Sequence, residues 1–309
     1  MVQRGAQLQG VLIALLSAVG FGLAPIFGKL AYRAGVLPYT LAMWRTVLAA
    51  ALLWIFYLIF WRGTVRVTWQ ELLGCIGMGL ANGIGSLCYY TGLARLDASL
   101  VQLLYTLYPI WVFVFLSAAG HPVSRLALAR FGVGLVGVLL ITRSGQKGVD
   151  WLGVMLVITS GALYGWHVVL GQWILADADS RIVTLYVLTT MAAVVTVARL
   201  TTSTPWESIS TSAWIAILLL ALIPTALARL LLFTSLRWLG GVQTSLLGVA
   251  ELVVALSVAF FFLGERLSLW QWGGAVLVVI SVLLIGREEA VPTTSWEELL
   301  REGRWRELQ

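Results

Sequence analysis

Four ionisable side chains lie deep inside long apolar stretches of this 309-residue chain, and they are its strongest candidates for chemistry. They are Arg45, His167, Arg229 and Glu251. An ionisable group within an apolar span is costly and marks a functional site by default. Glu251 could pair with a cation, receive an ammonium group or carry a proton, and an arginine could hold a carboxylate through two parallel hydrogen bonds. A purely structural buried pair is the alternative for Glu251.

Two of these groups have simpler interpretations. Arg229 lies two turns from the end of its apolar span, so we expect its side chain to extend to the lipid headgroups. His167 could titrate near neutrality, but no second histidine or carboxylate sits at metal-ligand spacing. Packing is therefore the stronger interpretation of His167, which stays a candidate for substrate contact. The sequence predicts no metal site, no cofactor and no catalytic residue.

Polar and aromatic residues recur at helical spacing within the apolar spans. One helical face carries Asn82, Ser86 and Tyr89. Lipid does not select such polar stripes, so we expect them to face the protein interior. Tyr105 and Tyr108 are too deep to be interface anchors, and they could stack on a substrate or fill the core. The predicted substrate-binding residues are Arg45, Asn82, Tyr89, Tyr105, Tyr108, Tyr164, Trp166, His167 and Glu251.

The composition indicates that these residues are positioned by membrane helices. The chain is 60% apolar and only 11% charged, whereas soluble domains carry about 25% charged residues. The net charge of +6 is typical of basic loops in a membrane protein, and no basic run with interleaved aromatics predicts a nucleic-acid partner. Cys75 and Cys88 fall in one predicted helix, about 20 Å apart, and cannot form a disulfide with each other.

Ten apolar spans separated by short polar breaks can be marked along the chain. Backbone groups in lipid must bond within their own segment, so the spans are predicted to be helices. The first span is read as a retained helix and not as a signal peptide. The spans cover residues 9–31, 38–60, 70–93, 98–118, 126–142, 151–175, 181–198, 212–236, 241–262 and 269–286.

The chain repeats itself at one fixed offset. GVLIALLSAVGFGLAPIFGK, from Gly10, is similar to GVMLVITSGALYGWHVVLGQ, from Gly153. YTGLARLDASLVQLL, from Tyr90, is similar to FTSLRWLGGVQTSLL, from Phe233, and both pairs are 143 residues apart. Two distant segments that share one offset indicate an internal duplication.

The duplication predicts an inverted repeat, because five helices in each half reverse the direction in which the second half enters the membrane. Inverted repeats are a recurring plan of secondary transporters, whose substrate site lies near the midplane between the halves. The predicted fold is an all-α membrane protein of ten transmembrane helices in two inverted five-helix repeats, 9–142 and 151–286. A tail, 287–309, follows and is expected to be cytoplasmic.

Two kinds of residue are expected to shape the helices. Pro25, Pro109 and Pro224 lie inside spans, where each removes one helical hydrogen bond and frees the carbonyl four residues earlier. Static kinks and gating hinges are both consistent with such prolines. Gly79 and Gly83 form a small-xxx-small pair that lets helices approach closely.

The end of the last repeat carries a family resemblance. FFLGERLSLWQWGGAVLVVISVLLIG, at 261–286, resembles the closing signature of EamA-type members of the drug/metabolite transporter superfamily. The first half departs from that signature, because AGHPVSRLALARFGVG, at 119–134, has His-Pro where Gly-Glu would fall. Glu265 in the LGER motif precedes the last span and is interpreted as structural, stabilised by the dipole of that helix.

The resemblance covers residues 9 to 286 and, within the superfamily, is closest to aromatic and neutral amino-acid exporters. It implies a ten-helix carrier of the inner (plasma) membrane with both termini cytoplasmic. It also implies a central cavity lined by helices 1–4 and 6–9.

The expected function is export of a broad range of amino acids by alternating access, with a small-molecule substrate and the lipid bilayer as partners. A zwitterion would suit a cavity with one carboxylate, one guanidinium and several aromatics. Nucleotide-sugars, sugar phosphates or drugs are the alternative cargo, although a phosphate would favour clustered basic residues. An intramembrane enzyme is disfavoured, because no G-x-S-x-G nucleophile motif is present. The pattern is compatible with a monomer.

Overall fold

The computed structural model describes residues 2–118, 125–142, 150–235 and 249–283, and within these ranges it contains helices and no strand. Seven helical segments among the described residues are long and apolar enough to cross a membrane. Three of them, Gln9–Arg33, Ala98–Ala118 and Thr211–Ser235, join consecutive helices that are named separately below. Three further apolar helices are shorter, and they are Gly132–Ile141, Ala250–Leu263 and Leu269–Ser281. Parts of the last three predicted spans and the whole predicted tail, 287–309, lie outside the described residues.

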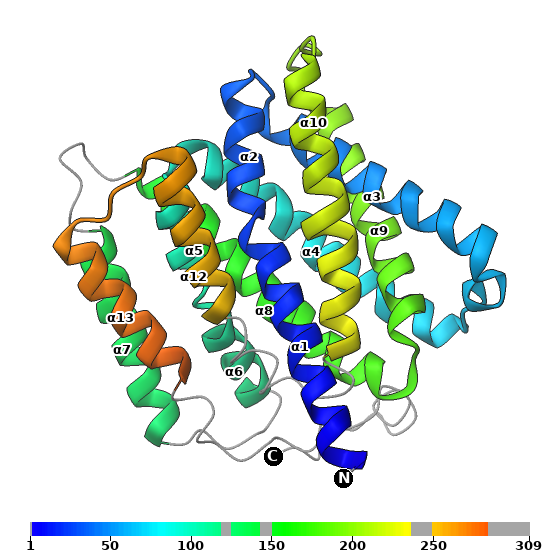
Figure 1. The fold of residues 1–309 in the computed structure, drawn as a ribbon, viewed down its shortest axis with the longest axis horizontal. Coiled ribbons are helices and arrows are strands. Elements are labelled where there is room, and N and C mark those ends of the chain that lie inside the picture. The colour runs from blue at the N-terminus through cyan, green and yellow to red at the C-terminus, as the bar shows by residue number, and fades with distance from the viewer. Residues whose placement is uncertain (1, 119–124, 143–149, 236–248, 284–309) are drawn as a thin grey trace.

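The helices can be followed along the chain in Figure 1. Those before residue 143 are α1 (Val2–Gly22), α2 (Ala24–Arg33), α3 (Pro38–Phe60), the 3-10 turn η1 (Arg62–Val65), α4 (Trp69–Arg95), α5 (Ala98–Tyr105), α6 (Tyr108–Ala118) and α7 (Arg125–Thr142). Those after residue 149 are α8 (Trp151–Asp177), α9 (Ser180–Thr201), α10 (Thr211–Leu220), the π-helix η2 (Ala221–Leu227), α12 (Val249–Val258), the π-helix η3 (Ala259–Leu263) and α13 (Leu269–Leu283).

Local sequence signals set several helix ends. Thr68 and Glu71 form a reciprocal capping box at the start of α4, in which the Thr68 amide donates to Glu71 Oε2 at 2.8 Å. Asp150 caps α8 by accepting from the Gly153 amide at 3.0 Å. Asp150 also pairs with Arg95, at the end of α4, with Nε and Oδ2 2.8 Å apart. These caps satisfy amide groups that a helix terminus leaves without a partner.

Each of the three prolines lies where a helix is interrupted. Pro25 begins α2 after the break at Leu23, and Pro109 begins α6 after the turn that ends α5. Pro224 lies inside η2, the wide turn that separates α10 from the helix continuing to residue 235. The expectation that these prolines interrupt the helices is confirmed.

The helices before residue 143 interleave with those after residue 149. α4 packs against α8 and α9, α2 against α10, α1 against α12, and α7 against α13 (Figure 1). Gly83 shows how closely α4 and α9 approach, because a Cβ added there would lie 2.8 Å from Val194 Cβ. Gly79, one turn earlier, faces Thr190 in the same way. The close packing predicted for this glycine pair is confirmed.

Large apolar side chains cover much of the outer surface. Leu269 is 90% exposed, and other outward-facing residues are Phe261, Phe262, Leu200 and Trp69. Polar residues such as Asn82 and Arg229 are buried instead. An exposed apolar surface of this extent fits a lipid environment and would be an aggregation hazard in water.

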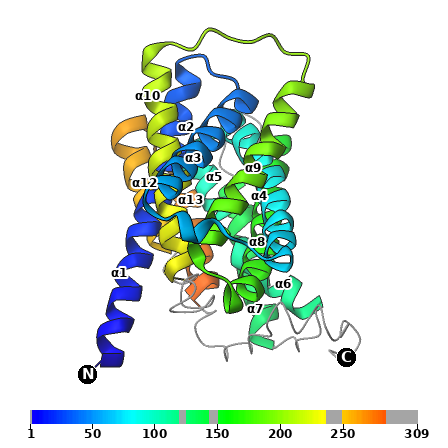
Figure 2. The same cartoon turned by 90° about the vertical axis from the view of Figure 1, so that its right-hand side faces the viewer.

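The two ends of the helix bundle differ in their connections. The start of α1 lies at one end, whereas the connections 34–37 and 202–210 lie at the opposite end (Figure 2). The 202–210 segment crosses that end from α9 to α10. We call the end that carries these two connections the loop end.

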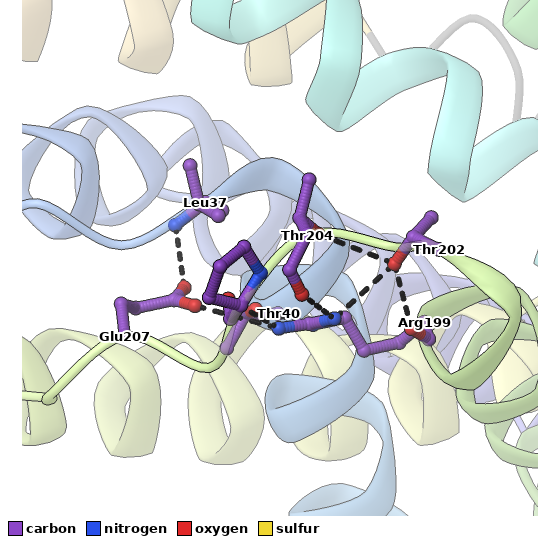
Figure 3. Close-up of polar contacts among 7 residues, drawn as sticks. Leu37, Thr40, Arg199, Thr202, Thr204 and Glu207 are labelled. Carbon is purple, nitrogen blue, oxygen red and sulfur yellow. Dashed lines mark hydrogen bonds and ion pairs between the residues drawn. The ribbon is translucent and has the colours of Figure 1, made fainter.

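Arg199 ties the two connections together at the loop end (Figure 3). It is only 1% exposed, and its Nε donates to Thr40 Oγ1 at 2.8 Å. Its Nη1 donates to Thr202 Oγ1 at 3.2 Å and to the Thr204 carbonyl at 3.1 Å. Its Nη2 donates to the Pro205 carbonyl at 3.1 Å. Every nitrogen of this buried guanidinium therefore has an acceptor.

Glu207 completes this Arg199 cluster. Its Oε1 accepts from the Leu37 amide at 2.8 Å, and its Oε2 lies 3.6 Å from Arg199 Nη2. The Arg199 guanidinium also lies 4.0 Å from the centre of the Trp206 ring. The cluster thus joins the start of α3 to the 202–210 connection.

Glu265 makes a second cross-connection, from the turn that follows η3. Its Oε1 accepts from the Ala98 amide at 2.9 Å, and its Oε2 accepts from the Ser99 amide at 2.8 Å and from the Ser99 hydroxyl at 2.6 Å. Gly264, with φ of +72°, provides the left-handed turn that precedes it. The carboxylate caps the start of α5, and not the start of the last helix as the sequence led us to expect.

Candidate functional site

A cavity of about 60 Å³ lies where the interrupted helices meet. Phe21 and Ala24 flank the break between α1 and α2, Tyr105 ends α5, and Pro224 lies in η2; all four line the cavity. The remaining walls come from α3, α4, α8, α12 and the helix after η2. Discontinuous helices around a central cavity are the arrangement in which transporters place polar backbone and side-chain groups. We call this cavity the central pocket.

Arg45 enters the pocket from α3 and is 6% exposed. Its Nη1 donates to Thr225 Oγ1 at 2.9 Å, and its Nη2 donates to Ser86 Oγ. The guanidinium lies 4.4 Å from the centre of the Tyr90 ring, and Nε has no partner among the described residues. Arg45 therefore has neutral partners from two other helices.

The irregular turn η2 supplies one of those partners. Pro224 lacks an amide hydrogen, which frees the Leu220 carbonyl four residues earlier. The Thr225 hydroxyl donates to that carbonyl at 2.7 Å and accepts from Arg45. The proline interruption thus positions an acceptor for a guanidinium group in the pocket.

Arg229 lies in the pocket and not at the headgroups, so the expectation that it extends to the membrane surface is wrong. It is 5% exposed and faces α4, where the side-chain oxygen of Asn82, with the amide turned toward Arg229, accepts from both of its Nη atoms. Its Nε is buried with no partner among the described residues. A side chain can extend to the headgroups only from a lipid-facing position, and residue 229 is on the inward face.

Glu251 enters the pocket from the first turn of α12. Its Oε1 accepts from Gln102 Nε2 at 2.9 Å. Within the part of the chain that the structure describes, Glu251 forms no ion pair, and neither do Arg45 and Arg229. A buried ion pair, which was the structural alternative for Glu251, is therefore absent from these residues.

Three tyrosines form one aromatic wall of the pocket. The ring centres of Tyr89 and Tyr105 are 5.1 Å apart, and those of Tyr105 and Tyr164 are 5.4 Å apart. These separations and tilted or edge-on geometries are those that aromatic pairs prefer. Tyr108 and His167 contact Tyr164 from behind, at 4.9 Å and 5.5 Å between ring centres. They support the wall without lining the pocket.

His167 and Trp166 are placed for packing. His167 is 0% exposed, and its Nδ1 lies 3.1 Å from the Met78 carbonyl, which makes Nδ1 the protonated nitrogen. Trp166 packs edge-on against Phe115 and Trp173, away from the pocket. The predicted site residues that do line the pocket are Arg45, Asn82, Tyr89, Tyr105, Tyr164 and Glu251.

The internal repeat of the sequence points to Arg229, a pocket residue that helical spacing alone did not identify. The stripe residues Asn82 and Ser86 occupy positions equivalent to Thr225 and Arg229, each pair being 143 residues apart. In the structure Arg229 donates to Asn82, and Arg45 donates to both Ser86 and Thr225. Transferring the polar stripe of α4 by the repeat offset would have identified Arg229 as a pocket residue and Thr225 as an inward-facing partner for Arg45.

The fold and the pocket define a class of protein. The chain is a multi-pass helical membrane protein with a polar pocket enclosed by interrupted helices, which is the construction of a membrane transporter. No group of three metal-ligating side chains occurs among the described residues.

Comparison with known proteins identifies the family. The model of the EamA-like transporter family matches residues 8–143 and again residues 151–287, so the chain belongs to that family. The resemblance to the drug/metabolite transporter superfamily is thereby confirmed, and the protein is a transporter and not an enzyme.

Two individual proteins are similar to the chain. The uncharacterized transporter YcbK of Bacillus subtilis (strain 168) is 22% identical over 289 residues, which are 87% of this chain and 91% of YcbK. A crystal structure of another protein is similar with a TM-score of 0.66 and 16% identity, covering 89% of this chain and 96% of that one. The second likeness supports the fold alone.

Proposed function

We propose that this protein is a carrier that moves small carboxylate-bearing metabolites, with amino acids as the first candidates, through the central pocket by alternating access. The observation that carries the proposal is the combination of Arg45, Arg229 and Glu251 around one cavity, beside a tyrosine wall. Guanidinium groups bind carboxylates with charge-assisted, paired hydrogen bonds, and a carboxylate or a tyrosine face attracts an ammonium group. The tyrosines offer apolar area to the rest of the cargo.

The proposal includes a topology. Ten helices would cross the membrane as two antiparallel units, 9–142 and 151–286, with both termini cytoplasmic in the inner membrane and with export as the direction of net flux. The two family matches support this arrangement, as do the seven long and three short apolar helices found among the described residues. The start of α1 would then lie on the cytoplasmic side and the loop end on the outer side (Figure 2).

Alternating access would use the contacts at the loop end. The Arg199 cluster and Glu265 join segments before residue 143 to segments after residue 149, so the two would separate when the pocket opens outward. Closure on one side and opening on the other is the cycle that inverted repeats support. The helix interruptions beside the pocket would serve as hinges in this cycle.

A sugar phosphate is the second candidate cargo. Two arginines in one pocket provide the clustered positive charge that a phosphate requires. A pocket of about 60 Å³ favours a small phosphate ester over a nucleotide-sugar.

Counterflow in proteoliposomes tests the proposal. Purified protein would be reconstituted with one unlabelled compound inside, and entry of the same labelled compound would be measured against protein-free liposomes. Amino acids or other carboxylates are expected to show counterflow that saturates with concentration. Counterflow of sugar phosphates or neutral drugs, with none for any carboxylate tested, would overturn the proposed cargo class.

A further inference from the structure

We infer that the cargo carries a net negative charge, so that acidic amino acids and other organic anions are transported in preference to zwitterions. The inference rests on the proposed function, because it names the charge of the cargo held by the same pocket. It also narrows the range expected from the sequence, which included neutral and aromatic amino acids.

The charges around the pocket do not balance. Arg45 and Arg229 line it, and guanidinium groups remain protonated in proteins. Among the described lining residues Glu251 is the only carboxylate, so one positive charge is in excess when Glu251 is ionised. Protonation of Glu251 would increase the excess. The pocket therefore favours an anion in either protonation state.

The partners of the two arginines solvate their charge without neutralising it. Arg45 donates to the hydroxyls of Thr225 and Ser86, and Arg229 donates to the amide oxygen of Asn82. All three acceptors are neutral. A buried charge without a counter-ion is unfavourable, so an anion that enters the pocket gains more than the same anion would gain at an exposed arginine.

Arg229 has fewer acceptors than Arg45. A guanidinium has five N–H donors, and both Nη atoms of Arg229 share a single amide oxygen in the described structure. The Nε atoms of Arg229 and Arg45 are both buried with no partner among the described residues. The Nη atoms of Arg45, however, have two separate hydroxyl acceptors, and its guanidinium lies over the Tyr90 ring. Arg229 is thus the group that distinguishes an anion from a zwitterion.

A cargo with one net negative charge would bring the net charge of the occupied pocket to zero when Glu251 is ionised. An amino acid with an acidic side chain would place its two carboxylates on the two guanidinium groups and its ammonium on Glu251. A 2-oxo acid has the same net charge and would leave Glu251 with Gln102, its present partner. A neutral amino acid has one carboxylate and one ammonium, so it leaves the excess positive charge of the pocket uncompensated.

Matched pairs of compounds test the charge directly. Glutamate and glutamine have nearly the same shape and differ by one charge, and phenylpyruvate and phenylalanine share a ring but differ by the ammonium group. Each would compete in counterflow at neutral pH with the membrane potential clamped at zero. We expect the anion of each pair to compete roughly tenfold or more better than its partner, because only the anion compensates the excess positive charge of the pocket.

Two variants attribute the preference to Arg229. Arg229→Gln removes the excess charge, so the ratio of glutamate to glutamine transport should fall to about one or below. Arg229→Lys keeps the charge and should keep the preference, even where its geometry lowers the rate. Because a ratio does not depend on how much protein folds, a partly unstable variant still gives a result. An unchanged ratio in Arg229→Gln would contradict the assignment to this residue.

The outcomes separate this inference from the proposed function. Counterflow of glutamine or phenylalanine equal to that of its anionic partner would overturn the charge inference and leave the amino-acid carrier standing. Counterflow of a sugar phosphate, with none of the four carboxylates moved, would overturn the proposed cargo class while supporting an anionic cargo.

Discussion

Arg199 and Arg229 are both buried arginines of the second repeat, yet their surroundings differ completely. Every nitrogen of Arg199 has an acceptor, and a carboxylate and an indole ring lie beside it. Arg229 has the amide oxygen of Asn82 and an Nε without a partner among the described residues. Burial of a charge therefore does not identify a binding residue, whereas the inventory of its partners does.

The difference follows from backbone geometry. Arg199 lies at the end of α9, where the non-helical connection leaves the carbonyls of Thr204 and Pro205 free to accept. Arg229 lies among helices, whose carbonyls are occupied by their own hydrogen bonds, so only side chains can serve it. An arginine at a span end can be satisfied by the protein alone, but one inside the bundle keeps donors for a ligand.

The largest expected effect is on stability, at Arg199. Arg199→Gln would leave the Thr40 hydroxyl and two backbone carbonyls without their donor and Glu207 without its counter-ion, and we expect a loss of about 3–5 kcal/mol in unfolding free energy. A lower unfolding temperature in detergent is the measurement. The ratio of glutamate to glutamine transport, in protein that remains folded, should stay that of the wild type. A shift in that ratio would show that the two arginines do not have separate roles.

Arg229 is expected to show the opposite behaviour. Arg229→Met removes a buried charge that has no counter-ion, so the unfolding temperature should be unchanged or higher. Transport of the anionic cargo should fall by roughly 30-fold or more, because truncating a buried charged contact costs about 2–5 kcal/mol. Counterflow and thermal unfolding on the same preparation give both values. A variant that unfolds earlier and transports normally would place Arg229 with Arg199 as a structural residue.

Glu265 provides a comparison of intermediate size. Glu265→Gln removes the charge and one acceptor from the start of α5, so a loss of about 1–2 kcal/mol is expected, as for a helix cap. Ser99→Ala removes only the hydroxyl that donates to Glu265 and should have the smaller effect. Thermal unfolding of both variants checks the order. Equal unfolding temperatures in the Glu265 variant and the wild type would mean that this cap does not stabilise the fold.

Much of the fold could be predicted from the sequence, but helical spacing alone could not predict the orientation of Arg229. The apolar spans, the proline interruptions and pocket residues such as Asn82 and Tyr164 follow from hydrophobic runs and helical spacing. Arg229 follows η2, a π-helix whose wider turn shifts the phase of every residue after it. A face assigned from regular helical spacing is therefore wrong beyond residue 227, and apolar neighbours do not reveal whether a face meets lipid or protein.

The smallest expected effect is the pH dependence of stability that Glu207, the carboxylate paired with Arg199, contributes. Burial would raise the pKa of Glu207, but hydrogen bonds from the Leu37 amide and its own amide, with the Arg199 charge, lower the pKa below its ordinary value. A carboxyl with a lowered pKa contributes stability at neutral pH that is lost as the pH falls through its folded pKa. The contribution should be below about 1 kcal/mol, because the ion pair is long at 3.6 Å and partly solvated.

Unfolding temperatures measured from pH 7 down to about pH 2.5 test this expectation, because the contribution is lost only below the ordinary glutamate pKa of about 4.3. Glu207→Gln should show a shallower decrease on acidification than the wild type, and at neutral pH it should already resemble the acidified wild type. Arg229→Met should decrease in parallel with the wild type, because no carboxylate pairs with Arg229 in the described structure. A shallower decrease in Arg229→Met would instead indicate that its guanidinium is coupled to an acid, most directly Glu251, and would remove the charge excess assigned to the pocket.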